Sequence, residues 1–133
     1  MGYSFGKNMT NNLVMIALKN ACYLQSIGKN NKIIFHSDLG SQYTSNDIKN
    51  LCNEFNIIQS FSQKGCPYDN ACIESFHAVL KKEEIYRNIY ENYEDAKKAI
   101  FEYIEGFYNS KRLYSALAYN TPNEVEFKAL NAA

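Results

Sequence analysis

The acidic residues of this sequence are unevenly distributed. No aspartate or glutamate occurs before Asp38, although the same stretch contains four lysines, Lys7, Lys19, Lys29 and Lys32. Over the whole chain the charges balance, with 14 basic and 14 acidic residues among 133. A balanced net charge gives no bulk electrostatic sign of a nucleic-acid partner. The positions of the carboxylates are therefore more informative than their number.

Other absences exclude further classes of protein. The four cysteines, Cys22, Cys52, Cys66 and Cys72, include no C-x-x-C pair and have no pair of histidines nearby, which disfavours a zinc site. The longest apolar run, 13–18, is far too short to cross a membrane, and no signal-peptide pattern is present. We therefore expect a globular protein of the reducing cytoplasm with free thiols and no membrane partner.

The order of apolar patterns predicts an α/β fold. Strands rich in β-branched and aromatic residues are expected at 32–37 and 57–62, with a helix over 45–55 between them that begins in a capping box of Thr44 and Asp47. Such an order favours parallel strands joined by a right-handed crossover. Thr10 begins an earlier helix. The predicted core faces of the two helices are Leu13, Val14, Ala17, Leu18, Ala21 and Leu24, and Ile48, Leu51, Cys52 and Phe55.

The remaining elements are mostly helical. A turn is expected at 28–31, and the alternation in "GYSF" at 2–5 is compatible with a short strand. A helix over 70–86 has Cys72, Ile73, Phe76, Val79 and Leu80 on one side, and a helix from Asn92 has the stripe Ala96, Ile100, Tyr103, Ile104 and Phe107. Pro122 introduces a short last helix.

Two carboxylates stand out by their positions. Asp38 follows the predicted strand 32–37, and sites in open α/β sheets form beyond the carboxyl ends of strands. It is also suited to capping the turn before Gly40. Glu74 lies in the first turn of its helix, on the same face as Lys81. An ordinary N-terminal glutamate that offsets the helix dipole would have the same position, so spacing alone leaves both alternatives open.

Several separated motifs resemble one family. "HSDLGSQYTS", then "SQKGCPYDNACIESFHAVLKKE" and the ending "YIEGFYNSKRLYSALAYNTPNEVEF" resemble the catalytic core of integrase-like DDE transposases of bacterial insertion sequences, relatives of retroviral integrase. Thirty-five residues separate Asp38 and Glu74, which is the spacing that this family keeps between its last two acidic ligands. The likeness extends from about residue 2 to 127. We accordingly expect a partial catalytic core over 1–127 and a C-terminal tail over 128–133.

The resemblance implies a ribonuclease-H-like fold and DNA transposition or integration. Asp38 and Glu74 would be catalytic ligands of Mg²⁺ or Mn²⁺ in a two-metal site, for cleavage of a phosphodiester and strand transfer at element ends. The partners would be the ends of an insertion sequence and target DNA. A full-length transposase, or a second copy of this chain, would be a further partner.

Other residues acquire roles only through the resemblance. Lys81 and Lys82 match the lysine region after the glutamate, and we expect Lys81 to contact phosphate. Arg112 matches the arginine of the closing motif, for which DNA contact and a structural ion pair both remain open. His36 is expected to orient or pack rather than act as a general base. His77 is interpreted as a packing substitution, and Tyr114 occupies a position where relatives often have histidine.

The family uses three acidic ligands, and the first belongs to a strand upstream of the second. Because nothing before Asp38 is acidic, we expect this chain to lack the first strands and their carboxylate, and to be inactive by itself. Two functions are compatible with that expectation. One is a transposase core that needs a further segment. The other is a non-catalytic DNA-binding or dimerising remnant of a transposase.

Overall fold

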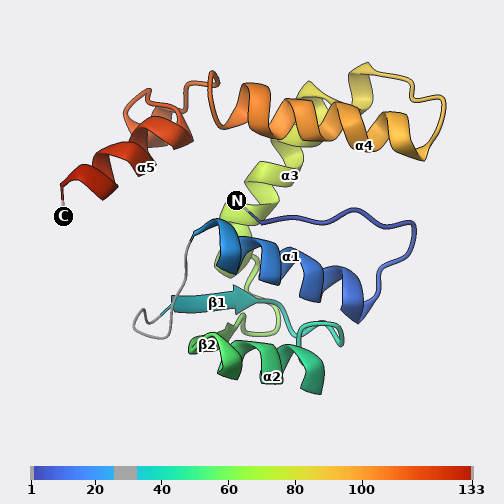
Figure 1. The fold of residues 1–133 in the computed structure, drawn as a ribbon, viewed down its shortest axis with the longest axis vertical. Coiled ribbons are helices and arrows are strands. Elements are labelled where there is room, and N and C mark those ends of the chain that lie inside the picture. The colour runs from blue at the N-terminus through green and yellow to red at the C-terminus, as the bar shows by residue number, and fades with distance from the viewer. Residues whose placement is uncertain (1, 26–32, 133) are drawn as a thin grey trace. The chain divides into compact units, whose positions relative to one another are not determined.

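The computed structural model describes residues 2–25 and 33–132. The chain forms two compact units, Met1–Glu74 and Ser75–Ala133, which are described separately below. Figure 1 gives the order of the elements along the chain. None of the helices in the described part of the chain has both the length and the apolar character that a membrane span requires.

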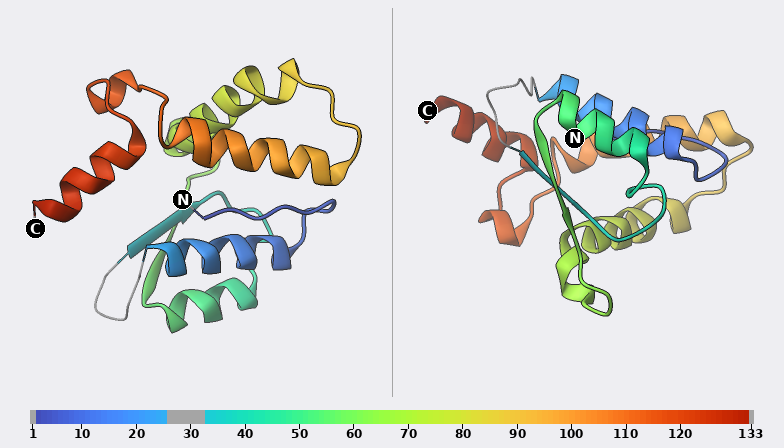
Figure 2. Two further views of the ribbon diagram at one scale, coloured as in Figure 1. Left: turned by 45° about the horizontal axis from the view of Figure 1, so that its top comes forward. Right: turned by 90° about the horizontal axis from the view of Figure 1, so that it is seen from below.

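The first unit is built on two parallel strands. β1 (Ile33–Ser37) pairs with β2 (Ile57–Phe61), with Ile33 opposite Ile57 and Ser37 opposite Phe61. Helix α2 (Asn46–Glu54) connects them, and α1 (Asn11–Leu24) precedes β1. Figure 2 shows α1 and α2 side by side over one face of the strands. The predicted pair of adjacent parallel strands with an intervening helix is thus confirmed.

The core of the first unit lies between the helices and the sheet. Cys22 of α1, Ile48 and Cys52 of α2 and Ile57 of β2 are buried together, with Val14, Met15, Leu18, Phe35 and Phe55 packed against them. The pattern predicted for α2 is confirmed. In α1 the predicted core residue Leu24 is wrong, because its side chain is 65% exposed. Cys22 takes its place since it lies one helical turn after Leu18, on the same face.

Two local predictions in this unit are wrong. Ser45, not Thr44, is the N-cap of α2, and its hydroxyl accepts from the Ile48 N–H. The Thr44 hydroxyl instead donates within the preceding turn, to Gly40 O. Residues 2–5 form no strand, because a strand needs a hydrogen-bonded partner along its edge. They lie along α1, where the Ser4 hydroxyl donates to Leu13 O at 2.6 Å. The predicted turn at 28–31 and the start of the strand at 32 lie outside the described residues.

The second unit is helical. Helix α3 (Ala71–Glu83) follows the single turn η1 (Pro67–Asn70), begins in the last residues of the first unit and continues into the second. It ends at Glu83, three residues earlier than predicted, and η2 (Ile85–Arg87) follows. Of the face predicted for α3, Phe76, Val79 and Leu80 are half-buried, whereas Cys72 and Ile73 are exposed.

The last helices begin where the sequence predicts. Asn92 caps α4 (Tyr93–Phe101), and Thr121 and Glu124 form a capping box at α5 (Pro122–Asn131) after the short η4 (Ser115–Leu117). Between them, α4 continues as a π-helix, η3 (Glu102–Tyr108). Tyr103 and Ile104 are buried as predicted, whereas Phe107 is 43% exposed. The wider π-turn changes which residues share a face, so the α-helical period no longer applies there.

Candidate active site

Asp38 directly follows β1, and hydrogen bonds from Ser62, the residue just after β2, fix the end of that strand. The carbonyl oxygen of Ser37 accepts from the N–H of Ser62 at 2.9 Å and from its hydroxyl at 3.2 Å. His36 lies between Ser60 and Ser62, with its Nδ1 2.9 Å from the first hydroxyl and its Nε2 3.2 Å from the second. Ser37 and Ser62 are both buried. The backbone just before Asp38 is therefore held by hydrogen bonds between buried residues.

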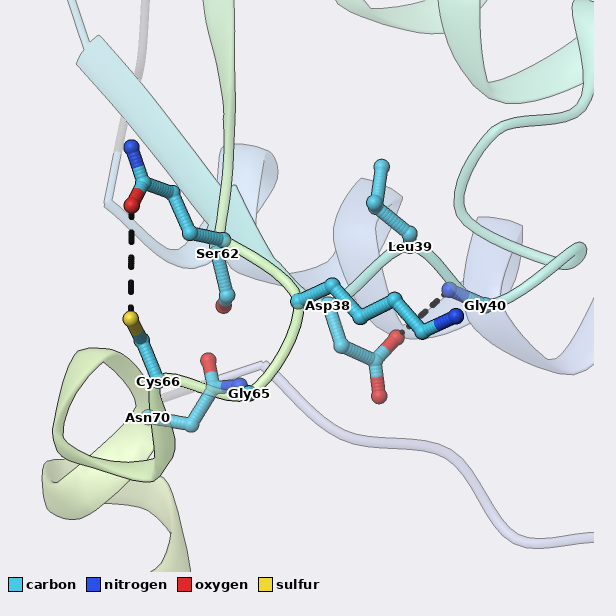
Figure 3. A pocket seen from close by; sticks show the side chains of 9 residues that line it. Asp38, Leu39, Gly40, Ser62, Gly65, Cys66 and Asn70 are labelled. Carbon is cyan, nitrogen blue, oxygen red and sulfur yellow. Dashed lines mark hydrogen bonds between the residues drawn. The ribbon is translucent and has the colours of Figure 1, made fainter.

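The Asp38 carboxylate caps the turn that follows it. Its Oδ1 accepts from the Gly40 N–H at 2.8 Å (Figure 3), so the turn-capping interaction considered from sequence is present. A Cβ at Gly40 would lie 2.8 Å from this same Oδ1, which means that only glycine fits without displacing the carboxylate. Burial raises the pKa of the nearby Tyr43 hydroxyl, and the negative charge of Asp38 raises it further.

Asp38 lies at one side of a shallow pocket of about 500 Å³. The loop after β2 and the η1 turn form the opposite side, where Cys66 and Asn70 project (Figure 3). Asp69 closes this loop by accepting from the Gln63 N–H at 3.1 Å. The lining residues are Asp38, Leu39, Gly40, Ser62, Gln63, Lys64, Gly65, Cys66 and Asn70. Carboxylate, hydroxyl and amide oxygens thus surround an opening that also carries one lysine.

Glu74 is exposed in the first turn of α3, one helical turn after Asn70. It does not line the pocket beside Asp38. Within residues 2–25 and 33–132, no three His, Cys, Asp or Glu side chains converge as metal ligands. A common site for Asp38 and Glu74 stays a prediction. The donor type fits Mg²⁺, which proteins often bind through one or two carboxylates together with substrate phosphates.

The predicted DNA-binding residues belong to the second unit. Lys81 and Lys82 are exposed in the last turn of α3. Arg112 forms an ion pair with Glu83, to which its Nη2 and Nε donate at 2.8 and 3.0 Å, so the structural alternative for this arginine is realised. The guanidinium holds the pKa of the Glu83 carboxyl below its usual value. Whether any of the three contacts DNA stays a prediction.

The two residues that depart from the family pattern, His77 and Tyr114, both make contacts through their rings. His77 is exposed beside the Phe76 ring, with 5.9 Å between ring centroids. The Arg112 guanidinium lies over the Tyr114 ring, 5.7 Å from its centroid, and Tyr114 also forms an isolated antiparallel bridge with Asn120. Tyr114 therefore takes part in holding the closing motif together.

Sequence reasoning did not predict the contacts that four residues make around these sites. They are Gly40, Ser62, Glu83 and Tyr103. The alternation of Ser60 in β2 and Ser62 just after it, opposite a strand that ends in His36 and Ser37, is a signal for Ser62. No local pattern predicts that Glu83 binds Arg112 and Tyr103, since Arg112 follows Glu83 by 29 positions and Tyr103 follows it by 20.

The chain is similar in sequence to known proteins. Residues 56–122 match the sequence model of the family described as "Integrase core domain". The chain is 40% identical over 129 residues to the transposase for insertion sequence element IS904 of Lactococcus lactis, covering 95% of this chain and 49% of the relative. It is 37% identical over 130 residues to transposase InsF for insertion sequence IS3A of Escherichia coli, covering 98% of this chain and 44% of the relative.

The fold has a counterpart among solved structures. The catalytic core domain of BIV integrase superposes with a TM-score of 0.63 at 22% identity, covering 92% of this chain and 74% of that one. This likeness supports the ribonuclease-H-like α/β fold that the motifs predict. The chain spans about half the length of the curated transposases that it matches. By its sequence, the chain belongs to the integrase core domain family, and its fold agrees with that assignment.

Proposed function

We propose that this chain acts as part of a DNA transposase, in metal-dependent cleavage and strand transfer at the ends of an insertion sequence. The observation that carries the proposal is the position of Asp38. A carboxylate directly after a parallel strand, with that strand end fixed by Ser62 just after the neighbouring strand, suits a rigid ligand. The match to transposases over 95% of the chain gives this carboxylate its chemical context.

Asp38 and Glu74 are the residues that would hold Mg²⁺ or Mn²⁺. When bound, such ions supply an activated oxygen nucleophile and neutralise charge on the leaving oxygen. The residues of this chain would orient the site. The Gly40 N–H holds one oxygen of Asp38 and leaves the other free, while the α3 backbone sets the direction of Glu74.

The second unit would contribute electrostatic attraction to DNA. Lys81 lies two helical turns from Glu74 on the same face, or about 10 Å along the axis. That separation suits a carboxylate near the scissile phosphate and an ammonium on a neighbouring phosphate. Lys82 and Arg112 are the other proposed DNA contacts. Arg112 would use the guanidinium N–H groups that do not bind Glu83.

The chain alone offers two carboxylates where the family uses three. Relatives about twice as long would supply the third from the part that this chain does not span. A full-length transposase or a second copy of this chain is accordingly a proposed partner, in a cell compartment where its four cysteines stay free thiols. The alternative is a non-catalytic remnant that binds DNA or a transposase. It is favoured because no three metal-ligating side chains come together among the described residues.

A chimera tests the two functions against each other. The chain would replace its counterpart in the IS904 transposase, and transposition of a marked element would be counted. The enzyme proposal predicts transposition by the chimera, a loss of about 100-fold or more in Asp38→Asn and Glu74→Gln, and little change in Glu54→Gln, an exposed carboxylate of α2. The isolated chain with Mg²⁺ should show little cleavage of element ends. A well-expressed chimera that binds element ends but never transposes would favour the remnant.

A further inference from the structure

We propose that Glu83 and Arg112 are positioning residues: their ion pair holds helix α3 and thereby sets the direction of the Glu74 carboxylate. The inference rests on the proposed function for the role of Glu74. Its structural basis is independent of that role. In this inference Arg112 positions Glu74 by holding helix α3. The family resemblance had left open a direct contact between Arg112 and DNA.

The ion pair is part of a network that is largely shielded from water. The Arg112 side chain is 19% exposed and that of Glu83 is 28% exposed. Arg112 donates two hydrogen bonds in a fork to Glu83, and the Tyr103 hydroxyl donates a third to the same carboxylate at 2.7 Å. The guanidinium also lies 5.7 Å from the ring centroids of both Tyr108 and Tyr114. An arginine held by a carboxylate and two aromatic rings has little freedom to reorient toward another ligand.

Helix α3 is attached to this network at two points. Phe76 packs edge-on against Tyr108, with ring centroids 5.0 Å apart, and Glu83 binds Arg112 seven residues later. Residues seven apart share a helix face, about 10 Å apart along the axis. Two attachments on one face fix both the rotation of a helix about its axis and its position along it.

Glu74 lies on the other side of the same helix. Glu83 lies nine positions after Glu74, which at about 100° per residue is half a turn of the helix wheel. On the helix wheel, Glu74 therefore lies on the face opposite to that of Phe76 and Glu83. Lys81 shares the Glu74 face, so one clamp would orient both side chains.

The π-helix supplies the correct spacing for the network. The N–H of Asn109 donates to Ile104 O and that of Arg112 to Phe107 O, each at 2.9 Å and each five residues back. Backbone hydrogen bonds between residues five apart widen the helical turn, so that residues five apart lie on one side of the helix. Tyr103 and Tyr108 are five apart, and their ring centroids are 6.3 Å from each other. π-helical turns are rare and frequently occur at functional sites. Here the turn presents both tyrosines to the Glu83–Arg112 pair.

Amide hydrogen exchange of the chain tests the inference without any activity. Arg112→Gln and Glu83→Gln should each speed exchange along α3 by about tenfold, including the amides at 75–78, which donate to the carbonyls of the first turn. The charge-reversed pair Glu83→Arg with Arg112→Glu should restore protection in part. Arg112→Lys, which keeps the charge but loses the fork, should restore less than full protection.

Matched tyrosine variants add a control. Tyr103→Phe removes only the hydroxyl that donates to Glu83 and should speed α3 exchange. Tyr108→Phe keeps the ring that contacts Phe76 and Arg112 and should not. If the glutamine variants loosen only the last turn of α3 and residues 109–114, the ion pair is a local tie and the inference is wrong.

Binding of Mn²⁺, measured by electron paramagnetic resonance, separates the inference from the proposed function. Glu74→Gln and Arg112→Gln should both weaken Mn²⁺ binding several-fold, and the charge-reversed pair should recover part of it. If Glu74→Gln weakens binding and Arg112→Gln does not, the positioning role is refuted. If Glu74→Gln has no effect, the proposed function of Glu74 fails, and the exchange rates alone decide whether the pair holds α3.

Discussion

The N–H and the hydroxyl of Ser62 both donate to the carbonyl oxygen of Ser37, at 2.9 and 3.2 Å, one residue before Asp38. Because the Ser62 hydroxyl also lies 3.2 Å from His36 Nε2, a single buried side chain ties the end of β1 to β2. These hydrogen bonds, rather than the turn that follows Asp38, fix the backbone from which the Asp38 side chain projects.

Removal of the Ser62 hydroxyl should therefore destabilise the first unit. We expect Ser62→Ala to lower the free energy of unfolding by about 1 kcal/mol, since a buried carbonyl loses one of its two donors. Ser60→Ala is the matched control, because it removes only the more exposed bond to His36 Nδ1. Urea denaturation measures both. An equal loss in the two variants would contradict the special role of Ser62.

A methyl group at Gly40 should displace the Asp38 carboxylate. The added Cβ would lie 2.8 Å from Asp38 Oδ1 and 3.1 Å from Gln42 Nε2, both ends of side chains that can swing away. Gly40→Ala should thus change unfolding by less than about 1 kcal/mol but weaken Mn²⁺ binding by about tenfold. Gly106→Ala, where an added Cβ meets nothing within 4 Å, is the control. Unchanged Mn²⁺ binding in Gly40→Ala would argue against Asp38 as a ligand.

Acid should remove the contribution of the Glu83–Arg112 pair. Hydrogen bonds from Arg112 lower the pKa of the Glu83 carboxyl, so the folded state favours its ionised form. Its stabilisation is then complete above the ordinary glutamate pKa of about 4.3 and is lost as the pH falls through the lowered value. Thermal unfolding between neutral and acid pH should show wild type more stable than Glu83→Gln only at the higher pH. A difference that persists at the lowest pH would contradict this assignment.

Lys81 should contribute one phosphate contact if it binds DNA as proposed. Lys81→Gln should then weaken binding of duplex DNA at every sequence and reduce the slope of log affinity against log salt by about one. Lys98→Gln, which removes an exposed partner of Glu102, should leave the slope unchanged. Fluorescence anisotropy across a salt series measures both. An unaltered slope for Lys81→Gln would remove this lysine from the interface.

Much of the first unit was determined by the sequence alone. Two short β-branched runs around one amphipathic helix were sufficient to predict adjacent parallel strands, because local period and chain connectivity admit few alternatives. Thr10, Asn92 and Pro122 marked helix starts through side-chain and backbone chemistry that acts over three or four residues. Separated motifs in the right order predicted the family, which the comparisons confirmed.

The tertiary structure decided what depends on distant partners. Burial of Cys22 in place of Leu24 follows from where α2 lies, and the exposure of Phe107 follows from a π-turn that an α-helical period cannot anticipate. The choice of Ser45 over Thr44 as a cap depended on the Gly40 carbonyl, which engages the Thr44 hydroxyl. The partner of Arg112 lies 29 residues away, and only the folded chain brings its guanidinium to Glu83. Sequence patterns encode interactions within a turn or a strand, whereas such pairings form only when separate elements pack.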